Sequence, residues 1–237
     1  MNTINKLFVL LLIGILSTSC LMTGVIGSRN VTTENREINE DFTGIKVSQG
    51  IEVILTQDSQ VSLSAEMDDN LHELLITEVK DGILKMYFEK NVSKRKASII
   101  YLSIPKISSI KTSSGSEVES KNTLKVNDLY VDSSSGSEIS LRVDANNIES
   151  ESSSGSEIDL IGTCISLSAD SSSGSQIDAD ELQAETVTAE ASSGSDINVY
   201  ASRSIPAKAS SGASIDCDGN PREKNIKKSS GGDVDVY

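Results

Sequence analysis

The chain of 237 residues has few of the large side chains from which broad cores are built. It contains no Trp, three Phe and five Tyr, yet 37% of its residues are hydrophobic. Wide layered cores normally include several aromatic rings, because a ring buries more area than any aliphatic side chain. The shortage of rings beside ample aliphatic residues predicts a narrow, aliphatic core.

Histidine and basic residues are also scarce. The chain has one histidine, His72, and 21 Lys and Arg against 35 Asp and Glu, a net charge of −14. A Ser/His/Asp triad would have to use His72, which we expect to lie on the surface, and no serine stands in a recognisable nucleophile motif. The acidic balance disfavours nucleic acid as a partner, because its phosphates would be repelled.

The N-terminal residues 1–20, MNTINKLFVLLLIGILSTSC, have the pattern of a lipoprotein signal peptide. Lys6 precedes an apolar run from Leu7 to Leu16, which is too short to remain as a membrane-spanning helix. Small residues lead to Cys20, although Leu16 stands four rather than three positions before it. We predict lipidation of Cys20, the alternative being ordinary cleavage nearby. The acyl chains would then anchor the protein to a membrane through its N-terminus.

Residues 21–37 are polar and give few core signals, so we predict a flexible tether there. Removal of the signal sequence takes away Lys6 and no acidic residue, which leaves 20 basic and 35 acidic residues, a net charge of −15. The expected location is the cell envelope, as an outer-membrane lipoprotein. No acidic cluster directly follows Cys20, and the sequence leaves open whether the domain faces the periplasm or the outside.

The second half of the chain repeats one pattern. Two serines precede each of seven glycines at spacings of 21, 19, 19, 20, 18 and 19 residues: Gly115, Gly136, Gly155, Gly174, Gly194, Gly212 and Gly231. Three residues after each glycine comes a β-branched aliphatic: Val118, Ile139, Ile158, Ile177, Ile197, Ile215 and Val234. A flexible Ser/Gly linker would not hold an aliphatic residue at one fixed position. The glycines therefore mark bends in a repeat structure.

Alternation of apolar and polar residues on both sides of each bend indicates short strands with one buried face. Helical repeats are longer than this period, and the columns of leucine-rich repeats are missing. The sequence predicts an all-β fold, a right-handed parallel β-solenoid (β-helix) with about 19 to 20 residues per rung. We assign residues 112–237 to the Ser-Ser-Gly repeat solenoid.

An early rung precedes the first Ser-Ser-Gly. The segment FTGIKVSQGIEVIL at 42–55 aligns with ISSIKTSSGSEVES at 107–120, which places Gly50 on Gly115. Residues 38–111 thus form an N-terminal β region, made of this rung and an elaboration with one short helical turn near DDNLHELLITEV. The sequence does not decide whether this region is a separate domain.

These features resemble the bacterial autotransporter adhesin family with a head GIN domain. The similarity lies in the lipoprotein-like start, the F..I.V..G..V.L opening and the serial SSGS.I turns, including GSDIN at 194–198. It covers roughly residues 38–237. The resemblance implies a β-helical envelope protein and carries no catalytic residues.

Two polar columns follow the bends, at the second and fourth residues after each glycine. Their candidate cation-binding or partner-binding members are Glu138, Glu157, Asp159, Asp178, Asp196, Asn198, Asp216, Asp233 and Asp235. Like charges one rung apart repel by about 0.9 kcal/mol even in water. Ca²⁺ would suit these oxygens, and a basic protein is another candidate. The alternative is a solvated face that only keeps the sheet soluble.

Two further features concern the cysteines and the last rung. Cys164 and Cys217 follow bends three rungs apart, about 14 Å along the axis, whereas a disulfide needs Cα atoms within about 7 Å. We therefore predict that both are free. The final DVDVY has no polar capping segment, so the rung could pair with a second copy, be covered by a partner, or fray.

The sequence thus favours a noncatalytic envelope lipoprotein that presents an acidic solenoid surface to a protein or glycan ligand. Two alternatives remain open. One is a structural component of the envelope. The other is a carbohydrate-active β-helix enzyme, for which the chain offers acids but few of the basic and aromatic groups that such sites use.

Overall fold

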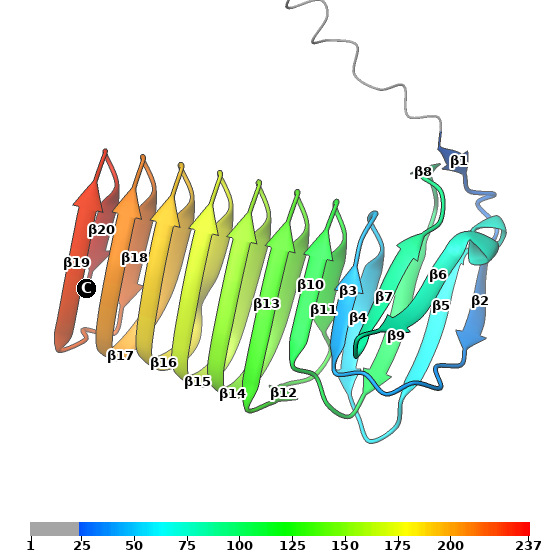
Figure 1. The fold of residues 1–237 in the computed structure, drawn as a ribbon, viewed down its shortest axis with the longest axis horizontal. Coiled ribbons are helices and arrows are strands. Elements are labelled where there is room, and N and C mark those ends of the chain that lie inside the picture. The colour runs from blue at the N-terminus through cyan, green and yellow to red at the C-terminus, as the bar shows by residue number, and fades with distance from the viewer. Residues whose placement is uncertain (1–23) are drawn as a thin grey trace, which may run out of the picture.

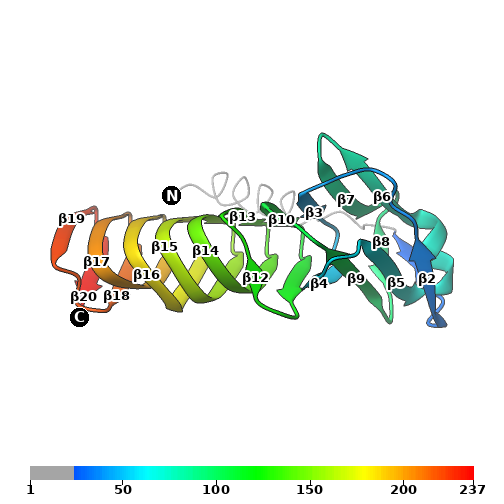
Figure 2. The same ribbon diagram turned by 90° about the horizontal axis from the view of Figure 1, so that it is seen from below.

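The computed structural model describes residues 24–237, and the predicted signal peptide with Cys20 lies outside the described residues. The fold is nearly all-β and forms a solenoid in which 18 strands share one continuous hydrogen-bonded sheet. The chain rises along one face, crosses a crest at a Ser-Gly bend and descends the other face (Figure 1). Figures 1 and 2 together show that the coil is right-handed, as predicted.

The strands next to the bends fall into three groups according to their position relative to a bend. Strands that lead into a bend are β3 (Gly44–Val47), β10 (Ser109–Ser113), β13 (Asp128–Ser134) and β19 (Glu223–Ser229). Strands that leave one are β4 (Glu52–Gln57), β11 (Glu117–Ser120), β18 (Ser214–Asp218) and β20 (Asp233–Val236), with the short β12 (Leu124–Lys125) after β11. Four long strands run from one bend to the next: β14 (Glu138–Ser153), β15 (Glu157–Ser172), β16 (Gln176–Ser192) and β17 (Asp196–Ser210).

Each bend is a tight turn with two successive residues in left-handed conformation. The serine before each bend glycine has φ between 49° and 59°, and the glycine has φ between 67° and 76°. Positive φ at both central positions is typical of a type I′ turn. Glycine adopts this conformation at little cost, which explains why it recurs at every bend.

A serine after the glycine fastens most of the bends. In the bend around Gly155, the Ser156 hydroxyl accepts a hydrogen bond from the Ser153 amide at 3.1 Å and lies 2.7 Å from the Ser133 carbonyl of the preceding rung. Ser137, Ser175 and Ser195 make equivalent bonds in their own bends. The serines therefore satisfy buried backbone groups that the sharp turn leaves unpaired.

The core is a stack of aliphatic columns, as the sequence predicts. The seven β-branched residues that follow the bends are between 0% and 4% exposed. Ile139 pairs in register with Ile158, and Ile158 with Ile177. Cys164 and Cys217 are free and buried, which confirms the prediction that they form no disulfide.

The early rung is also confirmed. β3 pairs in parallel with β10, with Ile45 opposite Ile110, and β4 pairs with β11, with Val53 opposite Val118. The N-terminal region therefore continues the stack of the Ser-Ser-Gly rungs through direct backbone hydrogen bonds.

A further rung lies beyond it, out of chain order. β7 (Ile83–Phe88) pairs in parallel with β3, and β9 (Ser98–Ile104) pairs in parallel with β4. Where the other rungs have a bend, this one has residues 89–97, which include β8 (Val92–Lys94). The insertion hides this rung from a search for glycine bends.

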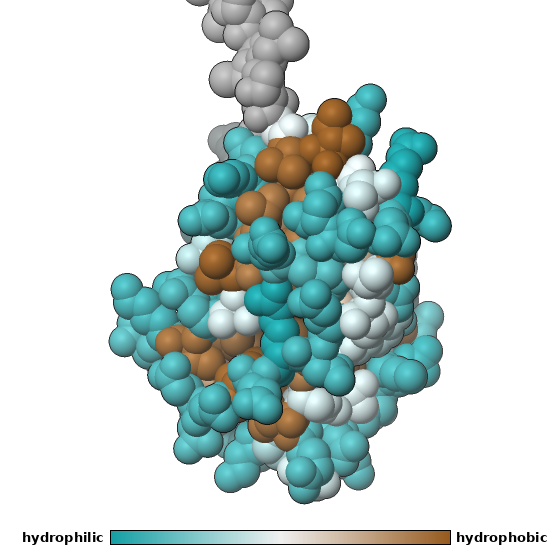
Figure 3. Space-filling view, turned by 90° about the vertical axis from the view of Figure 1, so that its right-hand side faces the viewer, coloured by the Kyte–Doolittle hydropathy of each residue, from teal (hydrophilic) through white to brown (hydrophobic). Residues whose placement is uncertain are grey.

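Antiparallel strands cap this end of the solenoid. β5 (Ser62–Asp68) pairs with β9 on one side and β2 (Val31–Arg36) on the other, while β6 (Leu75–Lys80) pairs with β7. The predicted helical turn is the 3-10 helix η1 (Asp69–Leu74). Figure 3 looks onto this cap, whose surface is mainly hydrophilic with several separate apolar patches.

Two predictions about the N-terminal region are wrong. Residues 25–36 are not a flexible tether, because β1 (Val25–Ile26) pairs with β8 and β2 pairs with β5. Polar residues serve as a strand here because β2 lies at the outer edge of the cap. His72 is buried rather than on the surface, at 4% exposed, with Nε2 lying 3.1 Å from the Thr32 hydroxyl.

Candidate binding surface

The acidic residues predicted from the repeat lie on one face of the solenoid, the face formed by the strands that leave the bends. We call it the acidic face. One column runs in register through Glu117, Glu138, Glu157, Gln176, Asp196, Ser214 and Asp233. The second runs through Glu119, Ser140, Asp159, Asp178, Asn198, Asp216 and Asp235. All nine candidate residues therefore point outward from the same sheet.

The neighbouring carboxylates raise one another's pKa. Partial burial raises the pKa of Glu138, and the charges of Glu117 and Asp159 add to the effect. Burial likewise raises the pKa of Glu157, followed by the charges of Asp159 and Glu138. This face consequently holds its negative charge at a cost that a bound cationic group would relieve.

A bulge in β16 interrupts the regular columns. Asp159 pairs with Asp178 and Gly162 pairs with Leu182, so β16 has one residue more than β15 over this stretch. The next strand, β17, has three residues fewer than β16 over the corresponding stretch, because Ala179 pairs with Val199 and Gln183 pairs with Tyr200. The extra residues push Asp180 and Glu181 outward from the face.

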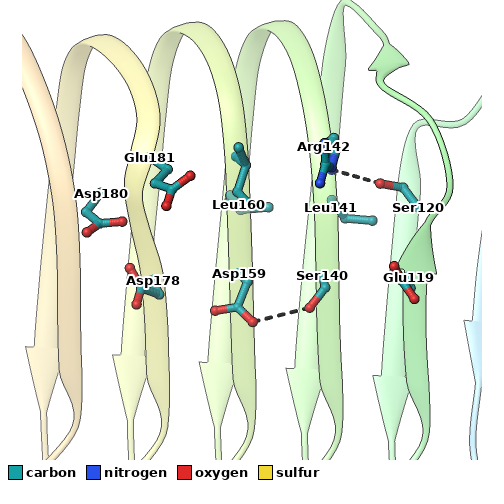
Figure 4. Close-up of a pocket in the computed structure, with 11 residues that line it drawn as sticks. Glu119, Ser120, Ser140, Leu141, Arg142, Asp159, Leu160, Asp178, Asp180 and Glu181 are labelled. Carbon is teal, nitrogen blue, oxygen red and sulfur yellow. Dashed lines mark hydrogen bonds between the residues drawn. The ribbon is translucent and has the colours of Figure 1, made fainter.

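The bulge forms one wall of an open groove of about 330 Å³. Figure 4 shows its lining side chains, which come from successive rungs. Those that carry polar groups are Glu119, Ser120, Ser140, Arg142, Asp159, Asp178, Asp180 and Glu181, and apolar contact comes from Leu141, Leu160 and Ile161. The groove is thus acidic, with Arg142 as its one basic lining residue.

Hydrogen bonds hold part of the groove and leave part of it free. Ser140 donates to Asp159 at 3.2 Å, and the Arg142 amide donates to the Ser120 hydroxyl at 2.8 Å (Figure 4). Asp178 Oδ1 is buried and accepts no hydrogen bond from the described residues. Burial, followed by the charge of Asp180, raises the pKa of Asp178. The groove can therefore receive hydrogen-bond donors or positive charge from a ligand.

The structure brings only some of the predicted residues into this groove. Asp159 and Asp178 line it, and the column with Glu138 and Glu157 runs beside it. The other five, Asp196, Asn198, Asp216, Asp233 and Asp235, continue along the face toward the C-terminal rung.

Sequence reasoning missed Arg142, Asp180 and Glu181. The spacing of 20 residues between Gly174 and Gly194, against 18 in the next repeat, is the signal that could have located the bulge. Arg142 follows the inward Leu141 in a position with no repeated character, so no pattern singles it out.

The described residues contain no group of three or more His, Cys, Asp or Glu side chains placed to hold a metal ion. The acidic columns are rows of carboxylates rather than a closed cage. In residues 24–237 there is also no helix with the length and apolar character needed to cross a bilayer.

A family model described as putative auto-transporter adhesin, head GIN domain, matches residues 41–221. Comparison with curated proteins gave no match.

Several solved structures share the fold. A putative adhesin from Bacteroides fragilis has a TM-score of 0.85 at 23% identity, covering 90% of this chain and all of the other. A putative lipid binding protein from Parabacteroides distasonis has a TM-score of 0.71 at 21% identity, covering 89% and 99% of the two chains. A putative adhesin from Parabacteroides merdae has a TM-score of 0.70 at 17% identity, covering 90% and 98%.

Proposed function

The chain belongs to the family described as putative auto-transporter adhesin, head GIN domain, and from that premise we propose that it is a noncatalytic cell-envelope lipoprotein that binds a cationic ligand on its acidic face. The observation that carries the proposal is the groove between the second acidic column and the bulge of β16. Asp159 and Asp178 stand in register there, Asp180 and Glu181 project from the bulge beside them, and Asp178 has a buried oxygen without a hydrogen-bond partner among the described residues.

The ligand class follows from the chemistry of the groove. Carboxylates accept hydrogen bonds and attract positive charge, which suits Lys- or Arg-rich protein segments and glycans that carry amino groups. One similar structure is described as lipid binding. An acyl chain would be a poor fit here, because the polar side chains of this groove would lose hydration without gaining partners.

Membrane attachment is the second part of the proposal. Lipidation of Cys20 would place the domain on the outer membrane, with the solenoid exposed to the periplasm or the outside. Metabolic labelling with a fatty-acid analogue should mark the full chain and not Cys20→Ser. Equal labelling of both would refute the anchor and leave the binding proposal intact.

Binding can be tested with a charge-neutral variant of the groove. The variant Asp159→Asn, Asp178→Asn, Asp180→Asn removes three lining charges, and Glu149→Gln, Glu151→Gln, Asp170→Asn removes three from the opposite face as a matched control. We expect immobilised polylysine and chitosan to retain the wild type and the control more strongly than the groove variant. Equal retention of all three would show that net charge, not the groove, is responsible.

The same protein variants distinguish the proposed binding protein from the two alternatives, a structural envelope component and a carbohydrate-active enzyme. A structural envelope component would retain no ligand from a panel of basic proteins and glycans, with or without Ca²⁺. A carbohydrate-active enzyme would release reducing sugar from a polysaccharide panel and lose that activity in the groove variant. Retention without turnover is the outcome expected for a binding protein.

Self-association through the C-terminal rung is opposed by the residues of that rung. Lys224 pairs in register with the buried Ile205, and Lys228 with the buried Ala209, so two core columns end in lysine. Burial of these ammonium groups against a second copy would be costly. We therefore propose that the rung of β19 and β20 ends the stack rather than joining two copies.

A further inference from the structure

One corner of the cap carries a cluster of basic residues on an otherwise acidic protein. The insertion at 89–97, which stands in place of a bend in the rung of β7 and β9, contains Lys90, Lys94 and Lys96, and the neighbouring loop contributes Arg29. All four side chains are exposed. Beside them lies Ile26, which is 65% exposed. We call these five residues the basic corner.

The fold holds the basic corner in a defined shape. β1 pairs with β8, with Ile26 opposite Lys94, and the Gly27 amide donates to the Lys94 carbonyl at 2.7 Å. The fully buried Asp68 carboxylate accepts hydrogen bonds from the amides of Arg29 at 2.9 Å and Lys96 at 3.1 Å. One carboxylate thus fastens both basic segments to the cap.

The exposed cations of the basic corner have no internal partners. None of them forms an ion pair with a described residue. The acids nearby are Asp68, engaged by backbone amides, Asp69, which accepts from Ser28 and Asn30, and the exposed Glu89. Arg95 turns inward instead, over the Phe88 ring at 5.8 Å.

The basic corner also lies at the N-terminal end of the described residues. Gly24 directly precedes β1, and the Val25 amide bonds to the Asn91 carbonyl at 2.8 Å. Gly24 is the fourth residue after Cys20, so the two Cα atoms are at most about 14 Å apart. If Cys20 carries lipid, as the proposed function requires, the basic corner lies within a few Debye lengths of the membrane surface.

We propose that the basic corner docks on an anionic lipid bilayer. The lysines and Arg29 would contact phosphate headgroups, and Ile26 would enter the interface beside them. Figure 3 shows an apolar patch at the upper edge of the cap, where Figure 1 places β1 and β8. The docked corner would set the orientation of the solenoid at the membrane, which a lipid anchor alone leaves free.

The distribution of charge favours an anionic bilayer as the partner of the basic corner. Residues 112–237 hold 9 basic and 22 acidic residues, a net charge of −13, and their rungs extend away from the cap (Figure 1). Screening over about 8–10 Å removes most of their repulsion at the bilayer. The acidic face of a second copy is the other chemistry that could meet the basic corner, and the test separates the two.

The test uses a chain that begins at residue 21 and so lacks Cys20 and its lipid. Every strand that the structure describes lies within this chain. Binding is measured by co-sedimentation with vesicles of phosphatidylcholine, alone or mixed with phosphatidylglycerol. The corner variant is Lys90→Gln, Lys94→Gln, Lys96→Gln. The matched control, Lys208→Gln, Arg222→Gln, Lys227→Gln, removes three exposed basic residues near the opposite end. Thermal melting verifies that both variants fold.

We expect the wild type and the control to bind the mixed vesicles, with little binding to phosphatidylcholine alone and with loss at high salt. Each lysine removed should weaken binding by about two- to fivefold, so the corner variant should bind about tenfold to 100-fold more weakly. No binding by the wild type, or equal loss in the control, would overturn the proposal. Oligomers that disappear in the corner variant would assign the corner to a second copy. Because the chain is unacylated, the result does not depend on lipidation of Cys20.

Discussion

At the residue scale, the bend serines explain how a sharp corner can repeat without leaving buried backbone groups unpaired. The hydroxyl of Ser156 reaches two carbonyls, Ser133 O at 2.7 Å and Ser153 O at 2.8 Å. The last two bends lack this serine, and the backbone closes them directly, as where the Ala213 amide donates to the Ser210 carbonyl at 3.2 Å. The hydroxyl is therefore one of two ways to complete the same turn.

The substitution Ser156→Ala should lower the free energy of unfolding by about 1–2 kcal/mol, because it leaves buried backbone groups with fewer partners. Ser154→Ala, in the same bend, should change it by less than about 0.5 kcal/mol, since that side chain is exposed and makes no hydrogen bond. Urea denaturation measures both. An equal loss in the two variants would mean that the bend tolerates no change at all, whatever the hydrogen bonding.

At the element scale, the bulge of β16 depends on close packing against the rungs before it. Gly162 of β15, where the register shift occurs, has φ of 131°, and a Cβ there would lie 2.0 Å from the Val143 carbonyl oxygen. The bend glycine Gly174 has φ of 68°, but a Cβ there would meet nothing within 4 Å. The two glycines are needed for different reasons.

Gly162→Ala should destabilise the fold by about 2–5 kcal/mol, because backbone strain and a steric clash with Val143 combine. Gly174→Ala should cost about 1–2 kcal/mol, because only the backbone conformation is unfavourable. Guanidinium denaturation of the two variants gives the comparison. A smaller loss for Gly162→Ala than for Gly174→Ala would show that the rungs can move apart at the bulge.

At the scale of the whole molecule, charge should make the protein more stable in mild acid than at neutral pH. Burial and neighbouring carboxylates raise the pKa of Glu117, Glu138 and Glu157 in the folded state. A raised folded pKa means that the folded protein binds protons more readily, so this contribution is present below the unfolded pKa and is lost as pH rises through the folded one.

Other groups act in the opposite direction at lower pH. The pKa of Asp68 is lowered, because three backbone N–H donors outweigh the effect of burial. Its contribution is lost as pH falls through that lowered pKa. We therefore expect the melting temperature to be higher at about pH 5 than at about pH 7.5 and to fall again in stronger acid. The double variant Glu138→Gln, Glu157→Gln should reduce the difference in melting temperature between about pH 5 and about pH 7.5. A wild-type melting temperature that rises from about pH 5 to about pH 7.5 would contradict the argument.

The repeat made most of the solenoid predictable, because one column of aliphatic residues fixes both the strand face and the register. Ile139, Ile158 and Ile177 stack as their spacing requires. The rung of β7 and β9 was hidden, since it joins the stack out of chain order and has an insertion in place of a bend. The buried His72 lies against Thr32, a contact across forty residues that no local pattern encodes. The repeat predicted the acidic columns. The groove also depends on the bulge in β16, which departs from the repeat.

The C-terminal rung carries the last prediction, which concerns association of whole molecules. Lys224 and Lys228 stand where the preceding rung has buried Ile205 and Ala209, so a second copy stacked on β19 would bury two ammonium groups. Lys224→Ile, Lys228→Ala restores the core pattern, although it also removes the ion pair of Lys228 with Asp233. We expect this variant to form dimers or longer end-to-end assemblies in sedimentation velocity, while Lys227→Ala, on the outward side of the same strand, stays monomeric. Assembly of the wild type, or a monomeric double variant, would show that the lysines do not end the stack.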